Sequence, residues 1–469
     1  MKNYNQLTPG LISRLKEIAG DRFVITSADD MEPYSHDETA TLKAMPWAVV
    51  KPENTDQISR IMQLAQNEKI PVTPRGAGTG LSGGAVPLYG GILLSTERLN
   101  KILEIDTENL MAVTQPGVIT AELQRAAEAK GLFYPPDPAS LESCFIGGNI
   151  AENSGGPRAF KYGVTRHYLT GLEVVWPDGR VSRIGGKLIK NVAGYDLLGL
   201  VCGSEGTLAV VTEITVRLIP RPPVEVDLLI PFPSIEKGVT AVTEIIKERI
   251  MPATMEFMEL KSVRAAEAFL KKEAPYRDAP AQLLIQLDGQ DKAELEKQYE
   301  KIGEIVSNFD AQDVLVAEDK TSKDRLWEVR RAISEAISVK SPVLKKDDVV
   351  VPRAKIPELF HRLADLEAKY GFEIVSFGHI GDGNVHVNIL KNDKAIEEWN
   401  ARAPELMKEI MSTVLSLGGS ITGEHGVGCV KKDFLPSAID PAALELMRHI
   451  KETLDPNYVL NPGKIFQNC

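Results

Sequence analysis

The stretch Pro74-Arg-Gly-Ala-Gly-Thr-Gly-Leu-Ser-Gly-Gly84 decides how the first part of this chain is interpreted. Glycine lets backbone N–H groups converge on an anion, because it adopts dihedral angles that other residues avoid. Thr79 and Ser82 add two hydroxyl donors. We therefore predict that this glycine loop holds a phosphorylated cofactor. The alternative is a flexible turn.

The segments that flank the glycine loop predict strands. Pro71-Val-Thr73 leads into the loop, and the apolar run Gly91-Ile-Leu-Leu-Ser95 follows it. Trp47-Ala-Val-Val50 is a third strand candidate, and Thr55 is expected to cap the helix after it. A loop between two strands differs from the dinucleotide-binding turn of a Rossmann fold, which opens a helix.

Residues 132–163 are a second candidate for the cofactor site. They are rich in Gly, Pro, Asn and Ser, as in Ile146-Gly-Gly-Asn-Ile-Ala-Glu-Asn-Ser-Gly-Gly156, and show no clear periodicity. We predict a long loop here, and such loops are uncommon in compact domains unless they bind something. Further segments of small residues are 115–118, 161–164 and 203–207.

The chain has 469 residues and a formal net charge of -11. This length predicts two or three domains, and the charge argues against nonspecific nucleic-acid binding. We find neither a signal peptide nor an apolar run of about 18 residues, so we expect a cytoplasmic protein, either free or held at a membrane by a partner. The four cysteines are too scattered for an iron–sulfur cluster, so electrons would leave to another molecule.

The proline cluster at 220–223 marks a predicted domain boundary. Beyond it, apolar strand candidates alternate with helical patterns, which is typical of a ferredoxin-like α+β layer. From about residue 411 the chain returns to helix and passes a Gly-Glu-His motif. The clearest helical patterns lie at 234–249, 291–307, 353–370 and 441–453.

Two histidine motifs predict a metal site. In His379-Ile-Gly-Asp-Gly-Asn-Val-His386, two predicted strands meet at a turn shaped by Asp382, so the flanking histidines can lie about 5 Å apart at Cβ. Glu424, in Gly423-Glu-His-Gly-Val-Gly428, offers a carboxylate. Two imidazoles and one carboxylate suit zinc, manganese or iron. The alternative is a pair of hydrogen-bonded histidines in a glycine-rich turn.

His425 is the candidate base. Adjacent residues of extended backbone point apart, so one of Glu424 and His425 can bind metal while the other faces a substrate. Imidazole titrates near neutral pH and is suited to accept a proton. Asn388 lies two residues after His386 and therefore faces the same side of the predicted strand.

From about Trp47 to Ile465, these motifs together resemble the vanillyl-alcohol oxidase/p-cresol methylhydroxylase (PCMH) flavoprotein superfamily. Their combination resembles its D-lactate dehydrogenase/glycolate oxidase large-subunit branch, which includes D-2-hydroxyglutarate dehydrogenase. The resemblance implies an α+β fold. A two-subdomain PCMH-type FAD-binding domain is expected at 1–221 and a ferredoxin-like α+β cap (substrate) domain at 222–410. A C-terminal helical segment at 411–469 would complete the active site and pack on the FAD domain.

The resemblance also implies bound FAD, with the glycine loop around the pyrophosphate. Some relatives attach FAD through a histidine in this loop; this chain has Gly78-Thr79 there, so we predict non-covalent FAD. Cys144 is expected to be a small packed residue rather than an attachment site. Asn461 and Lys464 either approach the flavin edge or cap the final turn. The predicted FAD-binding residues are Pro74, Arg75, Gly76, Ala77, Gly78, Thr79, Gly80, Ser82, Gly117, Pro138, Ser140, Cys144, Gly147, Gly148, Asn149, Ala151, Asn153, Gly155, Tyr162, Gly163, Glu205, Gly206 and Asn461.

Arg330 and Lys346 are assigned to the substrate by the same resemblance. Leu326-Trp-Glu-Val-Arg330 resembles a family segment whose arginine binds the substrate carboxylate bidentately. Lys346 corresponds to a second basic contact. Relatives often have Glu after that arginine, whereas this chain has Arg331. The alternative for both residues is a solvated surface charge.

Together these features predict an FAD-dependent dehydrogenase that oxidises a D-2-hydroxy acid, D-lactate or glycolate foremost, to the 2-oxo acid. The metal would polarise the hydroxyl, His425 would take its proton, and the α-hydrogen would pass as hydride to flavin N5. Electrons would go on to an electron-transferring flavoprotein, an iron–sulfur subunit or a quinone. The alternative is a flavin-holding electron-transfer subunit without its own substrate. A non-redox enzyme resembling alkyl-dihydroxyacetone-phosphate synthase is disfavoured, because its histidine-rich run is absent.

Overall fold

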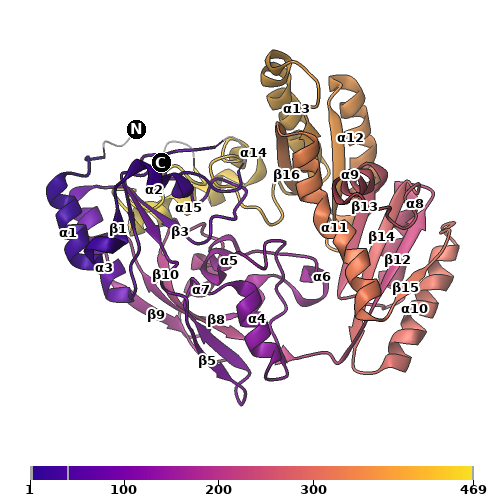
Figure 1. The fold of residues 1–469 in the computed structure, drawn as a ribbon, viewed down its shortest axis with the longest axis horizontal. Helices are drawn as coiled ribbons and strands as arrows, with labels where there is room; N and C mark the ends of the chain where they lie inside the picture. Colours follow the sequence, from indigo (N-terminus) through magenta and orange to yellow (C-terminus); the bar gives the residue numbers. More distant parts are fainter. Residues whose placement is uncertain (1–3, 40–41, 467–469) are drawn as a thin grey trace. The chain divides into compact units, whose positions relative to one another are not determined.

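The computed structural model describes residues 4–39 and 42–466, which form two compact units (Figure 1). The first unit comprises the residues up to 154, residues 164–221 and residues from 424 onward. The second comprises residues 155–163 and 222–423. The α+β class predicted from the sequence is confirmed, because both units combine sheets with covering helices.

The first unit contains a four-stranded sheet in the order β1-β2-β4-β3 and a five-stranded antiparallel sheet in the order β5-β6-β10-β8-β9. The glycine loop connects two strands, β3 and β4, as predicted, and the structure shows that these strands are parallel neighbours. The strands are β1 (Val24–Ile25), β2 (Ala48–Val50), β3 (Val72–Arg75), β4 (Ile92–Ser95), β5 (Ile102–Asp106), β6 (Met111–Thr114), β7 (Leu132–Phe133), β8 (Leu169–Val175), β9 (Val181–Gly185), β10 (Val210–Arg217) and β11 (Ile219–Pro220). The helices are α1 (Pro9–Ala19), α2 (Ala28–Met31), α3 (Thr55–Glu68), α4 (Thr120–Glu128), α5 (Ile146–Glu152), α7 (Leu197–Val201), α14 (Leu435–Ala438) and α15 (Pro441–Leu454).

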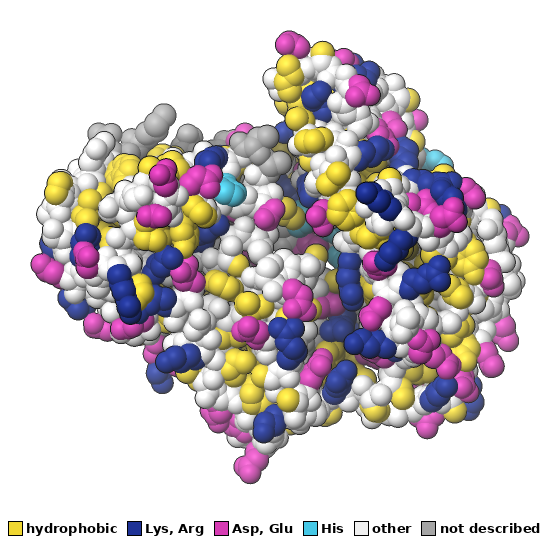
Figure 2. Space-filling model, viewed as in Figure 1, with side chains coloured by type: hydrophobic (Ala, Val, Ile, Leu, Met, Phe, Trp, Pro, Cys, Tyr) yellow, Lys and Arg dark blue, Asp and Glu magenta, His cyan; other side chains and the backbone are white. Residues whose placement is uncertain are grey.

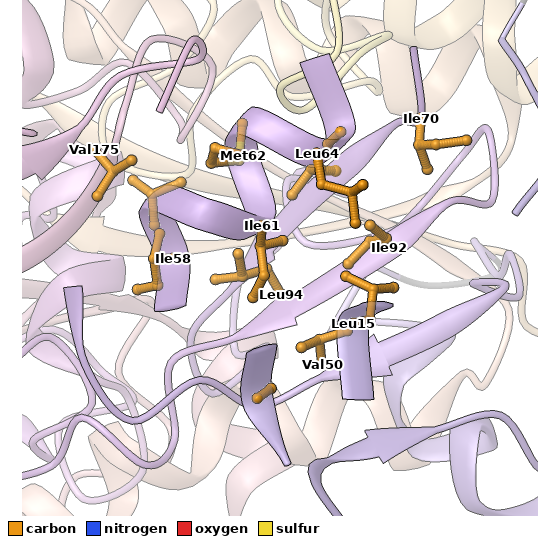
Figure 3. Close-up of a cluster of buried hydrophobic side chains, with 14 of the residues drawn as sticks. Leu15, Val50, Ile58, Ile61, Met62, Leu64, Ile70, Ile92, Leu94 and Val175 are labelled. Atoms are coloured by element: carbon orange, nitrogen blue, oxygen red, sulfur yellow. The ribbon is translucent and has the colours of Figure 1, made fainter. Parts of the chain in front are cut away.

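Helix α3 provides the core beneath the parallel strands (Figure 3). Its apolar residues Ile58, Ile61 and Leu64 recur at helical spacing and are buried against the sheet. The N-cap is Asn54, whose side-chain oxygen accepts the Gln57 N–H at 3.0 Å. The predicted cap, Thr55, is instead the first helical residue.

The predicted loop at 146–156 is wrong in its first half, because Ile146–Glu152 forms helix α5. Two glycines lower helix propensity and conceal this helix in the sequence. The structure needs at least one of them for packing: a Cβ on Gly147 would lie 2.5 Å from Cβ of Pro116. The glycine therefore permits close contact with the 115–118 segment.

The second unit is built on a seven-stranded antiparallel sheet in the order β15-β12-β14-β13-β17-β18-β16. Its strands are β12 (Val224–Phe232), β13 (Thr254–Glu259), β14 (Ala281–Gly289), β15 (Leu315–Ala317), β16 (Leu344–Val350), β17 (Glu373–His379) and β18 (Asn384–Leu390). Its helices are α6 (Ala159–Tyr162), α8 (Ile235–Lys247), α9 (Leu260–Leu270), α10 (Lys292–Ser307), α11 (Lys320–Lys340), α12 (Ile356–Tyr370) and α13 (Ile396–Ser416).

Each face of this sheet carries its own helices. Helices α9 and α11 pack on the face that displays Met258, through a core that includes Val263 and Ile333. Phe257 points to the opposite face and stacks edge-on against Phe360 of α12, at 5.1 Å between ring centroids. The α9/α11 face is the one that matters for the site, because the predicted ligands stand on it.

The second unit extends past the predicted cap boundary at 410. Helix α13 runs through that point and packs beside α12 (Figure 1). Pro404 lies inside α13, at a position where proline usually ends a helix, so the sequence pattern favoured a later start. Residues 155–163 also belong to this unit, because Lys161 and Tyr162 both donate to the carboxylate of Asp288 on β14.

Lysine, arginine and acidic side chains are interspersed on the face shown in Figure 2. Exposed ion pairs of the second unit include Lys272 with Glu328 and Lys369 with Glu409. Such pairs contribute little stability individually. Among the described residues, no helix combines the length and the apolar character needed to cross a bilayer.

Candidate functional site

Four segments that are distant in sequence meet at the glycine loop of the first unit. Glu205 N–H donates to the carbonyl oxygen of Ala151 at 2.8 Å, which joins segment 203–207 to α5. The side-chain amide of Asn461 donates to the carbonyl oxygens of Gly84 and Glu205, at 3.1 and 2.8 Å. A Cβ on Gly76 would be 3.6 Å from Cβ of Phe145. The predicted cofactor segments are therefore neighbours in space.

The polar atoms left around this loop fit a phosphorylated, hydrogen-bonding cofactor. Ser82 Oγ and Asn461 Oδ1 are buried and have no hydrogen-bond partner among the described residues. Such atoms are costly unless a ligand or water pairs them. A Cβ on Gly80 or on Gly148 would meet no atom within 4 Å, so open space lies beside both backbones. These are features that a bound cofactor would satisfy and fill.

Several predicted FAD-binding side chains near the glycine loop are hydrogen-bonded to other protein atoms. The Arg75 guanidinium donates to the carbonyl oxygens of His36 and Pro33, at 2.7 and 3.3 Å. Gly78 has φ of +79°, which other residues rarely adopt, and a Cβ there would lie 2.2 Å from Arg75 Nη2 and displace the guanidinium. Asn149 Nδ2 donates to Thr120 Oγ1 at 2.6 Å. These side chains are held by protein atoms, so the segment would meet a cofactor through its backbone.

Cys144 and Asn153 are also packed into the protein. Cys144 is buried, with Sγ 3.4 Å from Thr120 Oγ1, as expected of a small packed residue. Asn153 adopts a left-handed conformation at the end of α5, and its Oδ1 accepts the Arg166 N–H at 2.9 Å. Three further predicted FAD-binding residues, Gly155, Tyr162 and Gly163, lie in the second unit instead of the first.

Glu205 hydrogen-bonds to the segment that follows the Gly-Glu-His motif. Its carboxylate accepts the backbone N–H groups of Val427 and Gly428, at 2.7 and 2.6 Å. Burial raises the pKa of Glu205, and these two hydrogen bonds only partly offset the effect. The glutamate predicted to contact FAD thus positions residues next to His425.

The two predicted histidine ligands stand together on the α9/α11 face of the second sheet. His379 ends β17 and His386 lies in β18, with Phe377 directly opposite His386 across the strand pair. The two imidazole centroids are 5.2 Å apart. Potential ligand atoms of His379, His386 and Glu424 all lie within 4.8 Å of one another. The predicted hairpin therefore brings both histidines to one position.

Asp348 fixes the two residues before Glu424 by hydrogen bonds. It lies opposite His386 on β16, and its buried carboxylate accepts the Gly423 N–H at 2.7 Å and the Thr422 hydroxyl at 3.1 Å. Gly423 must lack a side chain, because a Cβ there would lie 2.2 Å from Nδ2 of Asn384. Glu424, the predicted carboxylate ligand, thus follows a tightly packed and hydrogen-bonded turn.

The donor set fits a divalent transition metal. Two imidazoles and one carboxylate are common ligands of zinc, manganese and iron, and three protein ligands leave coordination positions for a substrate. Asn384 Oδ1, on the residue opposite His379, is buried without a hydrogen-bond partner among the described residues. A polar ligand near the histidines would relieve that cost.

Besides Asp348, sequence reasoning missed Glu256, a second acidic residue of this site. It lies on β13 directly opposite His379 and is fully buried. One carboxylate oxygen is 2.6 Å from His379 Nδ1, and the other is 2.7 Å from Nε and 2.5 Å from Nη2 of Arg330. Burial alone would raise the pKa of Glu256, but the Arg330 guanidinium and His379 outweigh burial and lower it. The carboxylate is therefore ionised between its two partners.

Arg330 comes from α11 and lies over the aromatic ring of Phe377, with Cζ 4.8 Å from the ring centroid. The guanidinium edge formed by Nε and Nη2 faces Glu256. A bidentate contact with a substrate carboxylate would then use the outer end, formed by Nη1 and Nη2. The structure thus brings the predicted arginine to the same face as the histidines.

Lys346 and Asn388 face each other across β16 and β18 on this side of the sheet. Lys346 Nζ donates to Ser334 Oγ of α11 at 3.1 Å. Asn388 is buried, and its side-chain amide donates to the carbonyl oxygen of Val375 at 3.1 Å. Both predicted residues lie on the α9/α11 face, and their hydrogen bonds orient them.

Strand β13 also carries a glutamate with an unusual titration. Burial raises the pKa of Glu259 to about 7, although its carboxylate accepts the Ser376 N–H. The folded state therefore binds a proton that the unfolded chain has released above about pH 4.5. We expect the free energy of unfolding to fall by about 3 kcal/mol as pH rises from 4.5 to 7.

The measurement is thermal or urea unfolding across this pH range, for the wild type and Glu259→Gln. The variant is neutral at every pH, so its unfolding curve should show a smaller pH dependence than the wild type. Equal slopes for the two proteins would contradict the assignment.

Two family descriptions match this chain. "FAD linked oxidases, C-terminal domain" matches residues 221–465, and "FAD binding domain" matches residues 46–185. The first covers the whole second sheet and both histidine motifs. The second covers the glycine loop and α5.

Relatives in sequence span nearly the whole chain. The glycolate oxidase subunit GlcD of Bacillus subtilis (strain 168) is 42% identical over 460 residues, covering 98% of this chain and 97% of that protein. A D-lactate dehydrogenase of Anaerostipes hadrus is 40% identical and covers 98% of both chains. A D-2-hydroxyglutarate dehydrogenase of Stutzerimonas stutzeri (strain A1501) is 36% identical, covering 98% of this chain and 99% of that protein.

Solved structures share the fold at lower identity. The crystal structure of p-cresol methylhydroxylase with substrate bound matches with a TM-score of 0.83 at 18% identity, covering 99% of this chain and 98% of that one. The PCMH-type architecture predicted from the sequence is thereby confirmed. At this identity the likeness concerns the fold alone.

Proposed function

Because the chain belongs to the family of FAD-linked oxidases, we propose that it is a metal-dependent dehydrogenase of D-2-hydroxy acids, with D-lactate or glycolate as substrate. The observation that carries this proposal is the ligand cluster of His379, His386 and Glu424, which lies on the same sheet face as Arg330. A metal site beside an arginine that binds a carboxylate suits a substrate with adjacent hydroxyl and carboxylate groups.

The chain's residues would divide the work as follows. Arg330 and Lys346 bind and orient the substrate carboxylate, and Asn388 helps to orient the substrate beside His386. His425 accepts the hydroxyl proton. A divalent metal, held by His379, His386 and Glu424, supplies Lewis acidity that favours loss of that proton. Non-covalent FAD, held by the glycine loop, supplies the two-electron oxidation. We expect the electrons to pass to a partner protein or a quinone.

Metal removal tests the proposal. Dialysis against a chelator should abolish bleaching of the flavin by D-lactate and glycolate under anaerobic conditions, because the substrate hydroxyl then keeps its proton. Zinc, manganese or iron added back should restore bleaching, and the FAD absorbance should stay unchanged throughout. If metal-free protein bleaches at the original rate, the metal has no part in the reaction.

The second candidate is a flavin-holding electron-transfer subunit without its own substrate. The GlcD relatives are named as subunits of glycolate oxidase, which favours keeping this candidate. It predicts no rapid flavin reduction by any 2-hydroxy acid. A panel of D-lactate, L-lactate, glycolate and D-2-hydroxyglutarate separates the two functions and also identifies the substrate.

A further inference from the structure

Glu256 contacts two side chains of the second unit that are predicted to bind different ligands, namely a metal ion and the substrate carboxylate. Through one carboxylate oxygen it contacts Nδ1 of His379, a predicted metal ligand. Through the other it contacts Nε and Nη2 of Arg330, the predicted substrate contact. The residue is fully buried, so water does not compete for either oxygen.

Arg330 donates to one carboxylate oxygen of Glu256, and His379 Nδ1 lies 2.6 Å from the other. A carboxylate paired with a guanidinium accepts hydrogen bonds, so we assign the His379 proton to Nδ1. Nε2 is then the nitrogen that would ligate a cation. A carboxylate behind a ligating histidine fixes the imidazole tautomer and makes it a stronger ligand. The other oxygen contacts Nε and Nη2 of Arg330, whose Cζ lies 4.8 Å from the centroid of the Phe377 ring.

We propose that Glu256 is a positioning residue that couples metal binding to substrate-carboxylate binding, by orienting His379 with one oxygen and Arg330 with the other. This inference rests on the proposed function. It adds that the two binding events are energetically linked through one buried side chain. Removal of either partner should therefore change the strength of the other site.

Loss of the Glu256 carboxylate and loss of the Arg330 guanidinium should change the metal affinity in opposite directions. Glutamine at position 256 offers one acceptor and one donor, and so satisfies only one of two donating partners. Glu256→Gln should therefore weaken metal binding, by about 10- to 100-fold. Arg330→Met leaves the Glu256 charge uncompensated beside His379, and a cation restores the balance. We expect this variant to bind metal more tightly than the wild type, by about threefold or more.

The experiment measures the affinity of the purified, FAD-loaded protein for Zn²⁺ by competition with a chromophoric chelator, without any substrate. Glu259→Gln is the matched control, because Glu259 is buried on the same strand and contacts neither His379 nor Arg330. A second readout is the KM for D-lactate at saturating metal, which should rise at least tenfold in Glu256→Gln and stay unchanged in Glu259→Gln. If Glu256→Gln does not fold, Glu256→Asp, which is one methylene shorter, replaces it with the same expected losses.

Opposite signs for Glu256→Gln and Arg330→Met support the coupling. Weaker metal binding in both variants would indicate a purely structural role for the pair and overturn the inference. Unchanged metal affinity in Glu256→Gln, with a wild type that does bind metal, would overturn it as well while leaving the proposed function intact. A wild type that binds no metal would refute the proposed function itself.

Discussion

Replacement of His425 by asparagine is expected to lower kcat by 10²- to 10⁴-fold, the usual effect of losing a general base. His425 directly follows Glu424, which lies within reach of both histidine ligands. Asparagine keeps a polar side chain of similar size but does not accept a proton at neutral pH. Metal content and FAD absorbance should be unchanged, because His425 is predicted to bind neither.

The measurement is anaerobic flavin reduction by D-lactate in a stopped-flow instrument. His361→Asn is a matched control, since His361 is exposed on α12, on the far side of the second sheet from the ligands. Added imidazole should restore part of the rate in the His425 variant. A reduction rate within threefold of the wild type would remove His425 as the base.

Replacement of Arg330 by methionine should lower kcat/KM by about 10²- to 10³-fold. Loss of a charged hydrogen-bonded contact in a buried site costs about 2–5 kcal/mol. Arg330→Lys should recover less than tenfold of this loss. Lysine offers a point charge that cannot make the two parallel hydrogen bonds of a guanidinium.

The comparison that isolates the charge is D-lactate against its neutral amide. Wild-type protein should prefer the acid strongly, and Arg330→Met should lose most of that preference. Arg331→Met is the matched control, because Arg331 is exposed on the same helix and stacks on Trp327, with Cζ 5.5 Å from the ring. Retained discrimination in Arg330→Met would mean that another cation binds the carboxylate.

Local patterns in the sequence were enough to predict much of the fold. The glycine loop between two strands, the helix that begins near Thr55 and the hairpin that carries His379 and His386 all follow from short-range rules of turn chemistry and periodicity. Helix α5 and the start of α13 were missed for one reason. Glycine and proline disfavour helix locally, and packing against the rest of the protein overrides that preference.

Some residues of the candidate site could likewise be predicted from the sequence, and others could not. Two histidines and one carboxylate in short glycine-rich motifs predicted the candidate metal ligands, which the structure brings together. Glu256 and Asp348 gave no such signal, because neither lies in a histidine or glycine motif: Glu256 belongs to the strand Thr254–Glu259 and Asp348 to the Lys-Lys-Asp-Asp run of β16. Their importance comes from the register of the sheet, which places Glu256 opposite His379 and Asp348 opposite His386.

The sequence alone therefore determined which chemical groups this chain offers: a glycine loop, two imidazoles, a carboxylate and a neighbouring third imidazole. Only the tertiary structure decided which side chains hold these groups in place. Strand pairing joins residues that are more than a hundred positions apart, as with Glu256 and His379. No local pattern encodes such a partner, because register depends on how the whole sheet buries its two faces.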